Sequence, residues 1–404
     1  MPLPRPEDFA APPDAETRAR WRDAEREHRP GRAARLRARM ADEGVDAYFG
    51  LRSEHMRWLT GFTLAAGEDK VAGHSGQFLV GPDDITVVTD SRYTIQAHRE
   101  APDARIDEIG YDLPGAWPGL VQRTGARRMA VEAAAIPHQL WTQLAAATPD
   151  VELVAVEGWI EAMRAVKAPD EIERIAAACA VADRALAALL PEIRPGVTEH
   201  DLALRLEWLM RTGGAEALAF DVACLAGPEA ALPHGSPGDR PVLAGSVLLF
   251  DFGAQVEGYR SDMTRTLFVG EPTERDLAVY GLVAGAQEAA IEALRVASAA
   301  GSPMPDGRRL DSLARAAIDA DGRWPAYGHG LGHGIGLATH EEPRLSRSAP
   351  ETPLAGPTVF SVEPGIYLEG ELGVRIEDLV HLDPATGTVD LLTGFSREVI
   401  ALPA

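Results

Sequence analysis

The chain has 404 residues, of which 46% are hydrophobic, and a formal net charge of −22. This length allows two domains with cores of their own, and the strong negative charge argues against nucleic acid or an anionic membrane as a partner. Two cysteines in apolar surroundings exclude a disulfide framework. Because the first residues lack a secretory signal and no apolar run approaches bilayer length, we expect a cytoplasmic protein.

The first 160 residues predict an arm followed by an α/β domain. Residues 1–30, rich in Pro, Ala, Arg and acids, are interpreted as the arm. The run from Pro82 to Asp84 predicts the turn of a hairpin. Hydrophobic patterns predict helices over 31–44 and 137–147, and strands over 46–51, 76–81, 85–90, 128–133 and 151–156. This alternation is typical of an α/β domain, which we assign to residues 31–160.

The remaining residues, 161–404, are predicted to form a second domain containing a weak internal repeat. The boundary lies where a helix is broken at Pro169 and a new one begins. In each half, two helices precede two strands. The predicted helices cover 170–190, 198–212, 274–299 and 308–320, and the predicted strands cover 245–253, 258–269, 357–368 and 373–382. Each strand pair carries two acidic residues, so a repeat that closes on itself would bring four carboxylates to one centre.

The first acidic pair is Asp251 and Asp262. Asp251 ends an apolar run, where a buried acid is unfavourable unless it is paired or bound to a metal. Hairpin pairing would set the two acids close together, which is destabilising without a cation. The alternatives are a solvent-facing strand end for Asp251 and an ion pair with Arg260 or Arg265 for Asp262.

The segment over 328–343, GHGLGHGIGLATHEEP, is the most unusual in the chain, since it contains three histidines among five glycines. Glycine lets a backbone approach a ligand closely, and neutral imidazole is a common ligand of divalent metals. A flexible Gly-His tail is the alternative, which the strand patterns that follow argue against.

The second acidic pair, Glu363 and Glu377, lies in strand-like sequence. Arg375 and Glu377 are two residues apart and share a strand face, so a surface ion pair is the alternative. The apolar residues around both argue against it.

These observations give five candidate metal ligands: Asp251, Asp262, His333, Glu363 and Glu377. Such an oxygen-rich set suits two hard divalent ions, with Mn²⁺ favoured and Co²⁺ or Zn²⁺ as alternatives. Two ions about 3.5–4 Å apart could share carboxylates and a bridging water. The chemistry implied is hydrolysis of a polarised carbonyl.

The stretches DFGAQVEGYRSDMTRT, GHGLGHGIGLATHEEP, SVEPGIY and GVRIEDLV, in this order, resemble the pita-bread metallopeptidases. This family includes methionine aminopeptidase, prolidase, aminopeptidase P and the metal-free creatinase. RWLTGF and DSRYTIQA resemble stretches of the N-terminal domain in the aminopeptidase P and prolidase branch. The resemblance implies a creatinase-like α/β N-terminal domain and an α+β catalytic domain with a curved antiparallel sheet and a pseudo-two-fold repeat.

The resemblance carries the family's metal ligands onto all five candidates. It also matches His234 and His340 to substrate-side histidines, His329 to a pocket histidine of the proline-specific branch, and Arg375 to the arginine beside the last glutamate. The resemblance therefore implies that His234, His329, His340 and Arg375 bind the substrate. From the residues alone, His234 would be a loop histidine and His340 a partner of the two glutamates that follow it.

The implied function is removal of the residue before proline from the N-terminus of peptides by a dinuclear-metal Xaa-Pro aminopeptidase. Glu363, His340 and His234 are then the catalytic candidates, with Glu363 carrying the proton from water to the leaving nitrogen. An Xaa-Pro dipeptidase (prolidase) and a hydrolase or lyase of the same fold acting on a small non-peptide substrate are alternatives. A non-catalytic binding protein of the same fold is disfavoured, because it would lack a metal ligand and none is missing here. Methionine aminopeptidase is disfavoured because it normally lacks the N-terminal domain. The resemblance also implies a homodimer or a higher homo-oligomer.

Overall fold

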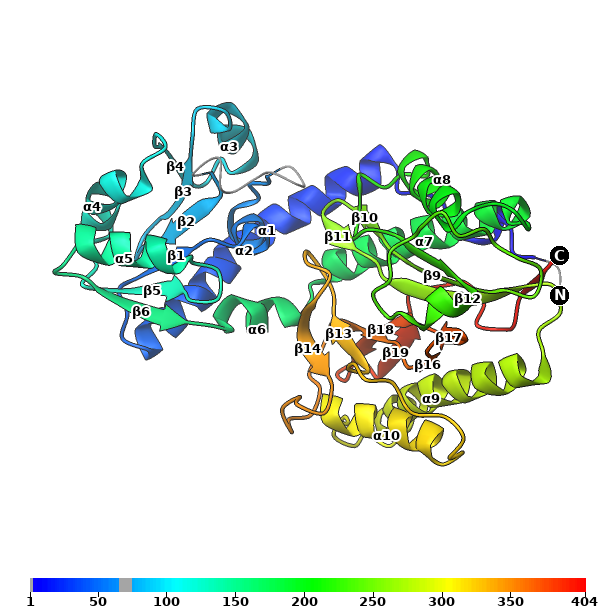
Figure 1. Cartoon of the computed structure of the whole chain (residues 1–404). Coiled ribbons are helices and arrows are strands. Elements are labelled where there is room, and N and C mark those ends of the chain that lie inside the picture. The colour runs from blue at the N-terminus through cyan, green and yellow to red at the C-terminus, as the bar shows by residue number, and fades with distance from the viewer. Residues whose placement is uncertain (1–2, 65–74) are drawn as a thin grey trace. The chain divides into compact units, whose positions relative to one another are not determined.

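The computed structural model describes residues 3–64 and 75–404 and divides into two compact units (Figure 1). One unit comprises Ala19–Met163, and the other comprises Met1–Arg18 with Arg164–Ala404. The sequence places the domain boundary at residue 160, within the short helix that ends the first unit. Both cysteines are buried and free.

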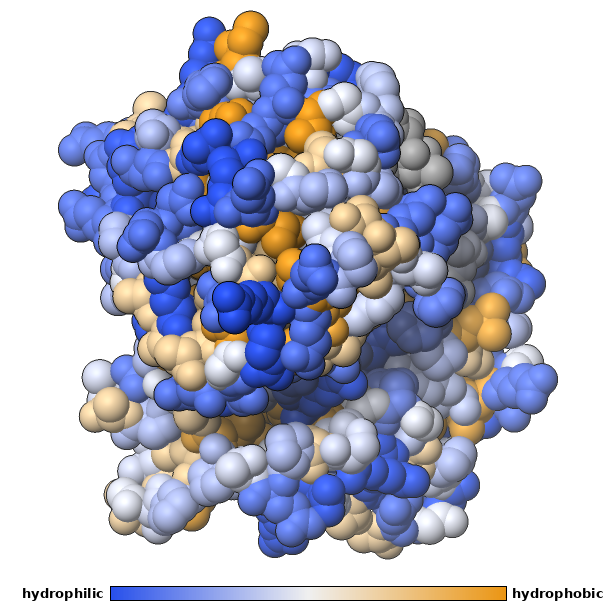
Figure 2. All heavy atoms as spheres, turned by 90° about the vertical axis from the view of Figure 1, so that its left-hand side faces the viewer, coloured by the Kyte–Doolittle hydropathy of each residue, from blue (hydrophilic) through white to orange (hydrophobic). Residues whose placement is uncertain are grey.

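The N-terminal unit is built on a six-stranded mixed sheet with strand order β4-β3-β2-β1-β5-β6. β2 and β3 form the predicted hairpin, and β1, β5 and β6 run parallel. The strands are β1 (Ala47–Gly50), β2 (Gln77–Val80), β3 (Ile85–Thr89), β4 (Arg105–Glu108), β5 (Arg128–Glu132) and β6 (Glu152–Val156). The helices are α1 (Ala15–Asp42), α2 (Ser53–Thr60), α3 (Thr94–Glu100), α4 (Leu113–Thr124), α5 (His138–Ala147) and α6 (Trp159–Ala165). Figure 2 shows one face of this unit, on which hydrophilic residues predominate and hydrophobic ones are scattered.

The predicted strands and the helix over 137–147 are present, but the N-terminal helix is longer than predicted. α1 begins at Ala15, inside the stretch interpreted as an arm. Trp21 is buried there, and Arg29 lies 3.6 Å from Glu25 one turn earlier. The Ala, Arg and Glu residues of this stretch favour a helix, and core packing with an i,i+4 ion pair stabilises it. The sequence also missed α4, whose glycines and prolines are poor helix formers.

The C-terminal unit confirms the repeat. In its first half, helices α7 and α8 precede a strand pair, β9 and β12, with β8 paired to β9. In its second half, α9 and α10 precede β15 and β18, with β13 paired to β15. All of these pairs are antiparallel. The sheets have strand orders β20-β12-β9-β8 and β14-β13-β15-β18-β19.

The helices and strands of the C-terminal unit have the following bounds. The helices are α7 (Pro169–Leu189), α8 (Glu199–Thr212), α9 (Glu274–Ala299) and α10 (Gly307–Asp319). The first half contains β7 (Ala217–Leu218), β8 (Ala223–Ala226), β9 (Val247–Phe252), β10 (Ala254–Val256), β11 (Tyr259–Arg260) and β12 (Met263–Val269). The second contains β13 (Gly332–Gly334), β14 (Glu341–Leu345), β15 (Thr358–Val362), β16 (Gly365–Leu368), β17 (Leu372–Arg375), β18 (Asp378–Asp383), β19 (Thr388–Leu391) and β20 (Ala401–Leu402).

Three of the predicted strands are interrupted, and the interruptions lie at acidic residues. In the second half, the long pair ends where Val362 faces Asp378, and the hairpin β16–β17 begins where Gly365 faces Arg375. Two residues on each strand therefore separate the two ladders, and Glu363 and Glu377 are among them. In the first half, Asp262 lies in the corresponding gap between β11 and β12. The predicted strands over 258–269, 357–368 and 373–382 are thus each divided in two.

Helix α9 corrects one expectation from the sequence. By length and composition it is apolar enough to cross a membrane, although no run was expected to approach that length. Its residues Val283, Ala290 and Leu294 are fully buried in the core of the C-terminal unit, together with residues of β15 and β17. Burial in this core accounts for these apolar residues, whereas Leu277 and Val296 of the same helix are exposed.

Candidate metal centre

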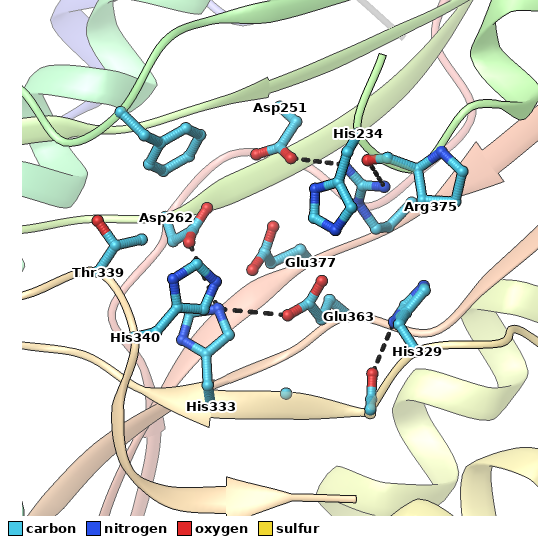
Figure 3. A pocket seen from close by; sticks show the side chains of 14 residues that line it. His234, Asp251, Asp262, His329, His333, Thr339, His340, Glu363, Arg375 and Glu377 are labelled. Carbon is cyan, nitrogen blue, oxygen red and sulfur yellow. Dashed lines mark hydrogen bonds and ion pairs between the residues drawn. The ribbon is translucent and has the colours of Figure 1, made fainter. Parts of the chain in front are cut away.

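One cavity of about 340 Å³ in the C-terminal unit contains every site residue that the sequence predicts (Figure 3). Its lining is Phe220, Pro233, His234, Asp251, Asp262, His329, Gly330, Gly332, His333, Thr339, His340, Glu363, Arg375 and Glu377. Sequence reasoning missed Phe220 and Pro233, since a single apolar residue in a loop carries no pattern, and it assigned no role to Thr339 within the histidine-rich segment.

The interruption after β15 brings Glu363 to His333. Leaving the ladder, the N–H of Glu363 donates to the carbonyl of Leu331, at 2.8 Å. The hydroxyl of Ser361 accepts from the backbone N–H of His333 and donates to Oε1 of Glu363, each at 3.1 Å. His333 Nε2 lies 3.4 Å from that oxygen, and its Nδ1 lies 3.0 Å from the carbonyl of Gly334. Because a carbonyl only accepts, Nδ1 carries the proton and the lone pair of Nε2 faces the acids.

A second chain of contacts connects Glu377 to Asp251. The N–H of Glu377 donates to the carbonyl of Thr264, at 3.2 Å. The hydroxyl of Thr264 donates to Glu377 Oε2 at 2.8 Å and accepts from Arg375 Nε at 2.9 Å. Arg375 Nη2 in turn donates to Asp251 Oδ2 at 2.6 Å. Two acids from different strands are therefore ordered by one hydroxyl and one guanidinium group.

The candidate ligands converge on a space that suits a metal ion. Asp262, His333 and Glu377 offer ligand atoms within 4.8 Å of one another, and His333 Nε2 lies 3.7 Å from Asp262. Figure 3 shows the side chains of Glu363 and Glu377 pointing into the same space. Among the residues that the structure describes, Asp251 Oδ1 is buried without a hydrogen-bond partner. A buried carboxylate oxygen without a donor is an expected metal ligand.

The charges of the four buried acids and the neutral ring of His333 favour the binding of cations. Burial, together with the charges of neighbouring acids, raises the pKa of both Asp262 and Glu377 well above their ordinary values. Burial also raises the pKa of Glu363, although Arg375 opposes that change. Burial lowers the pKa of His333, so its ring is neutral and able to bind a metal. Four acids face one arginine here, and divalent ions would supply the missing positive charge. The donor set therefore fits the metal ions expected from the sequence.

The three other histidines lie around this group. The ring of His340 is 4.2 Å from that of His333, centroid to centroid. Partial burial and the charges of His333 and His234 lower the pKa of His340 to about 4, so it is neutral at neutral pH. His329 is held at both nitrogens, Nδ1 by the carbonyl of Gly330 at 2.7 Å and Nε2 by the hydroxyl of Tyr367 at 2.9 Å. Tyr367 was not predicted as part of the site.

Arg375 is committed to the protein at all three guanidinium nitrogens. Besides Thr264 and Asp251, it donates through Nη1 to the hydroxyl of Tyr367 at 3.0 Å and to the carbonyl of Pro233 at 3.3 Å. Only 3% of the residue is exposed. This geometry favours a role in holding Asp251, and its predicted contact with substrate stays a prediction.

Glu341, considered from the sequence as a partner of His340, has other partners. Its carboxylate pairs with Arg164 and with Lys167, whose Nζ lies 3.2 Å away, and accepts from the N–H of Ala338 at 2.8 Å. The three charged side chains are at most 5% exposed. A buried ion cluster therefore fixes the loop that carries His340.

Glu341→Gln is expected to destabilise the C-terminal unit by about 3–5 kcal/mol, because it leaves two buried cations without their anion. Denaturant unfolding of the full chain measures this change. Glu342→Gln, at the neighbouring glutamate whose side chain is 39% exposed, is the control and is expected to stay within about 0.5 kcal/mol of the unchanged chain. A loss below about 1 kcal/mol for Glu341→Gln would show that the cluster is not needed.

The model of Metallopeptidase family M24 matches residues 173–384, and the model of the Creatinase/Prolidase N-terminal domain matches residues 32–166. An uncharacterized peptidase, YqhT, of Bacillus subtilis is 33% identical over 344 residues, which cover 85% of this chain and 93% of that protein. The structure of an Xaa-Pro dipeptidase from Bacillus anthracis has a TM-score of 0.81 at 30% identity, covering 92% of this chain and 99% of that one. An X-Pro aminopeptidase from Thermotoga maritima has a TM-score of 0.80 at 34% identity, with the same coverage.

The M24 match alone spans more than half of the chain, and it contains all five candidate ligands. The N-terminal match extends the likeness through the α/β unit. Similar structures include both a dipeptidase and an aminopeptidase, so they identify the branch and leave the choice between the two activities open. The chain belongs to the pita-bread metallopeptidases of family M24, in the Xaa-Pro peptidase branch that carries a creatinase-type N-terminal domain.

Proposed function

We propose that this protein hydrolyses the bond before proline at the N-terminus of peptides, as an Xaa-Pro aminopeptidase with two divalent metal ions. The observation that supports it best is the buried group of four carboxylates and one imidazole, whose negative charge the described residues do not balance. An Xaa-Pro dipeptidase is the second candidate, since proteins of that name are among the similar ones.

Asp251, Asp262, His333, Glu363 and Glu377 would hold the ions, which when bound supply a nucleophilic water and polarise the scissile carbonyl. Glu363 takes the proton of that water and passes it to the leaving imino nitrogen. Its carboxylate is suited to this role because the hydroxyl of Ser361 orients it. The neutral ring of His340, beside His333, can donate its N–H to the oxygen on which charge develops.

The walls of the cavity suit a proline ring. Phe220 and Pro233 offer apolar surface, and His329 is fixed on both sides, so it forms a rigid wall. His234 lies in the exposed loop after Pro233 and can contact the substrate without leaving its place. A preformed, partly apolar pocket is what a cyclic residue without an N–H requires.

The substrate test compares Xaa-Pro dipeptides with Xaa-Pro-Yaa tripeptides in the presence of Mn²⁺, with product analysis by mass spectrometry. We expect cleavage of the tripeptide into Xaa and Pro-Yaa, and no cleavage of Xaa-Ala-Yaa. Cleavage restricted to dipeptides would identify a dipeptidase instead. No cleavage of either class would favour the hydrolase or lyase acting on a small non-peptide substrate.

The metal identity, oligomer and location stay predictions. The oxygen-rich ligand set supports Mn²⁺, and metal analysis of the purified protein tests it. Two buried free cysteines are consistent with the cytoplasm. The homodimer rests on the resemblance, and light scattering tests it.

A further inference from the structure

Gln287 is a fully buried amide on α9, a helix whose other buried residues are apolar apart from the hydroxyl of Tyr280. Placing an amide in such a core is unfavourable unless its hydrogen bonds are made. Gln287 therefore requires hydrogen-bond partners within the core.

The partners of Gln287 lie at the gap between the two ladders. Its Nε2 is 3.1 Å from the carbonyl of Val362 and 3.3 Å from the carbonyl of Ile376. These are the residues immediately before Glu363 and Glu377. Because the strand pairing ends at this point, the backbone there needs partners from outside the sheet. One side chain thus binds both segments that carry the second acidic pair.

The buried ion pair of Asp378 and Arg265 holds the same part of the backbone. Asp378 accepts from Gln287 Nε2 through Oδ2, at 2.8 Å, and from Arg265 Nη2 through Oδ1, at 2.6 Å. The two hydrogens of Gln287 Nε2 are thus shared among three acceptors, the two carbonyls and Asp378. Arg265 Nη1 donates to the carbonyl of Glu377 at 2.6 Å and to that of Thr264 at 2.9 Å. Asp378 and Arg265 are each about 1% exposed. Three side chains, from α9, β12 and β18, therefore fix the backbone on both sides of Glu377.

We propose that Gln287 is a positioning residue of the metal centre, which with Asp378 and Arg265 keeps Glu363 and Glu377 at the spacing that bound ions require. The proposal rests on the proposed function, since it assumes that these glutamates are ligands. Repulsion between the acids acts to separate the two segments, and the amide resists it by binding both carbonyls. Gln287 lines no part of the cavity, so its effect reaches the ions through the backbone.

The test measures Mn²⁺ binding to the metal-stripped full chain by titration calorimetry. Gln287→Met, similar in size but without donors, is expected to raise the dissociation constant about 10- to 100-fold, as removal of groups that orient metal ligands does. Excess Mn²⁺ is expected to restore much of the activity. Ile291→Ala, one turn along the same buried helix face, is the matched control. It is expected to lower the melting temperature while its dissociation constant stays within about twofold of the unchanged chain.

Gln287→Asn gives a second test if Gln287→Met does not fold. Its amide is one methylene too short to reach both carbonyls, so it is expected to weaken Mn²⁺ binding in the same direction. If the unchanged chain binds Mn²⁺ and the Gln287 variants bind it equally well, the positioning role is overturned while the proposed function stands. If the unchanged chain itself binds no divalent metal, the proposed function fails and this inference fails with it.

Discussion

Glu363→Gln is expected to lower kcat for peptide hydrolysis by about 10²- to 10⁴-fold, the range that a positioned acid–base group contributes. Glutamine keeps the shape of the side chain and can still contact Ser361, but it cannot take a proton from water. Because the lost interaction belongs to the transition state, KM is expected to change little.

Glu369→Gln is the matched control for this experiment. Glu369 is exposed at the tip of the β16–β17 hairpin, so the same substitution there is expected to leave kcat unchanged within about twofold. Glu363 is also a candidate ligand, and the metal content of both variants must therefore be measured by elemental analysis. Full activity of a metal-loaded Glu363→Gln variant would show that another group moves the proton.

The sequence could predict the repeat and the acidic pairs because both depend on local pattern. Apolar periodicity indicates α7 and α10, and an acid next to an apolar run such as Val247–Phe250 can be recognised without a structure. The glycines around His333 signal close packing in the same way. A Cβ at Gly332 would lie 1.9 Å from the carbonyl oxygen of Ser361, so only glycine allows the two strands to meet there.

Most of the strand interruptions could not be predicted, because their causes are distant in the sequence. The residues around Glu363 favour a strand on both sides, although Pro364 and Gly365 mark a stop directly after it. The ladder ends because Glu363 finds its acceptor at Leu331 and Glu377 finds its own at Thr264. Strand propensity describes a residue and its neighbours, and it contains nothing about such partners.

The hydroxyl groups of the site were missed for a related reason. Thr264, Ser361 and Tyr367 each connect two functional groups. All three lie within the stretches that carry the family resemblance, but a hydroxyl beside a candidate ligand does not by itself show which group it contacts. The sequence also pairs Asp251 with Asp262 across the hairpin. In the structure Asp251 faces Thr264, and Arg375 is its nearest charged partner. The residue directly across the hairpin is thus a threonine, while Asp262, two residues earlier, lines the same cavity as Asp251 and lies near it as predicted.

The buried group of four acids predicts that Asp262→Asn has opposite effects on the stability of the metal-free and the metal-loaded protein. In the metal-free chain, burial and the charges of Glu377, Asp251 and Glu363 raise the pKa of Asp262 well above its ordinary value of 3.8. A raised folded-state pKa means that the folded state binds more protons than the unfolded state. The contribution of Asp262 to stability is therefore fully present below pH 3.8 and is lost as the pH rises toward the raised pKa. Asparagine does not ionise, so Asp262→Asn is expected to raise the melting temperature of the metal-free protein at about pH 8 more than at about pH 5.

With metal ions bound, the unchanged chain is expected to be more stable than the variant, because the ions bind the ionised acids. This stabilisation of the folded state grows with the logarithm of the metal concentration divided by the dissociation constant. Added Mn²⁺ is expected to raise the melting temperature of the unchanged chain strongly and that of Asp262→Asn weakly, since the variant lacks a ligand that lies 3.7 Å from His333. Calorimetry with a chelator and with Mn²⁺, at both pH values, measures all four states. Asp239→Asn, at an exposed acid, is expected to follow the unchanged chain throughout. If Mn²⁺ raises the melting temperature of Asp262→Asn as much as that of the unchanged chain, Asp262 is not a ligand. If the metal-free variant is less stable than the unchanged chain at pH 8, repulsion among these acids does not limit stability. The chain keeps a destabilising group of acids only if binding the metal requires it, and this experiment separates the two effects.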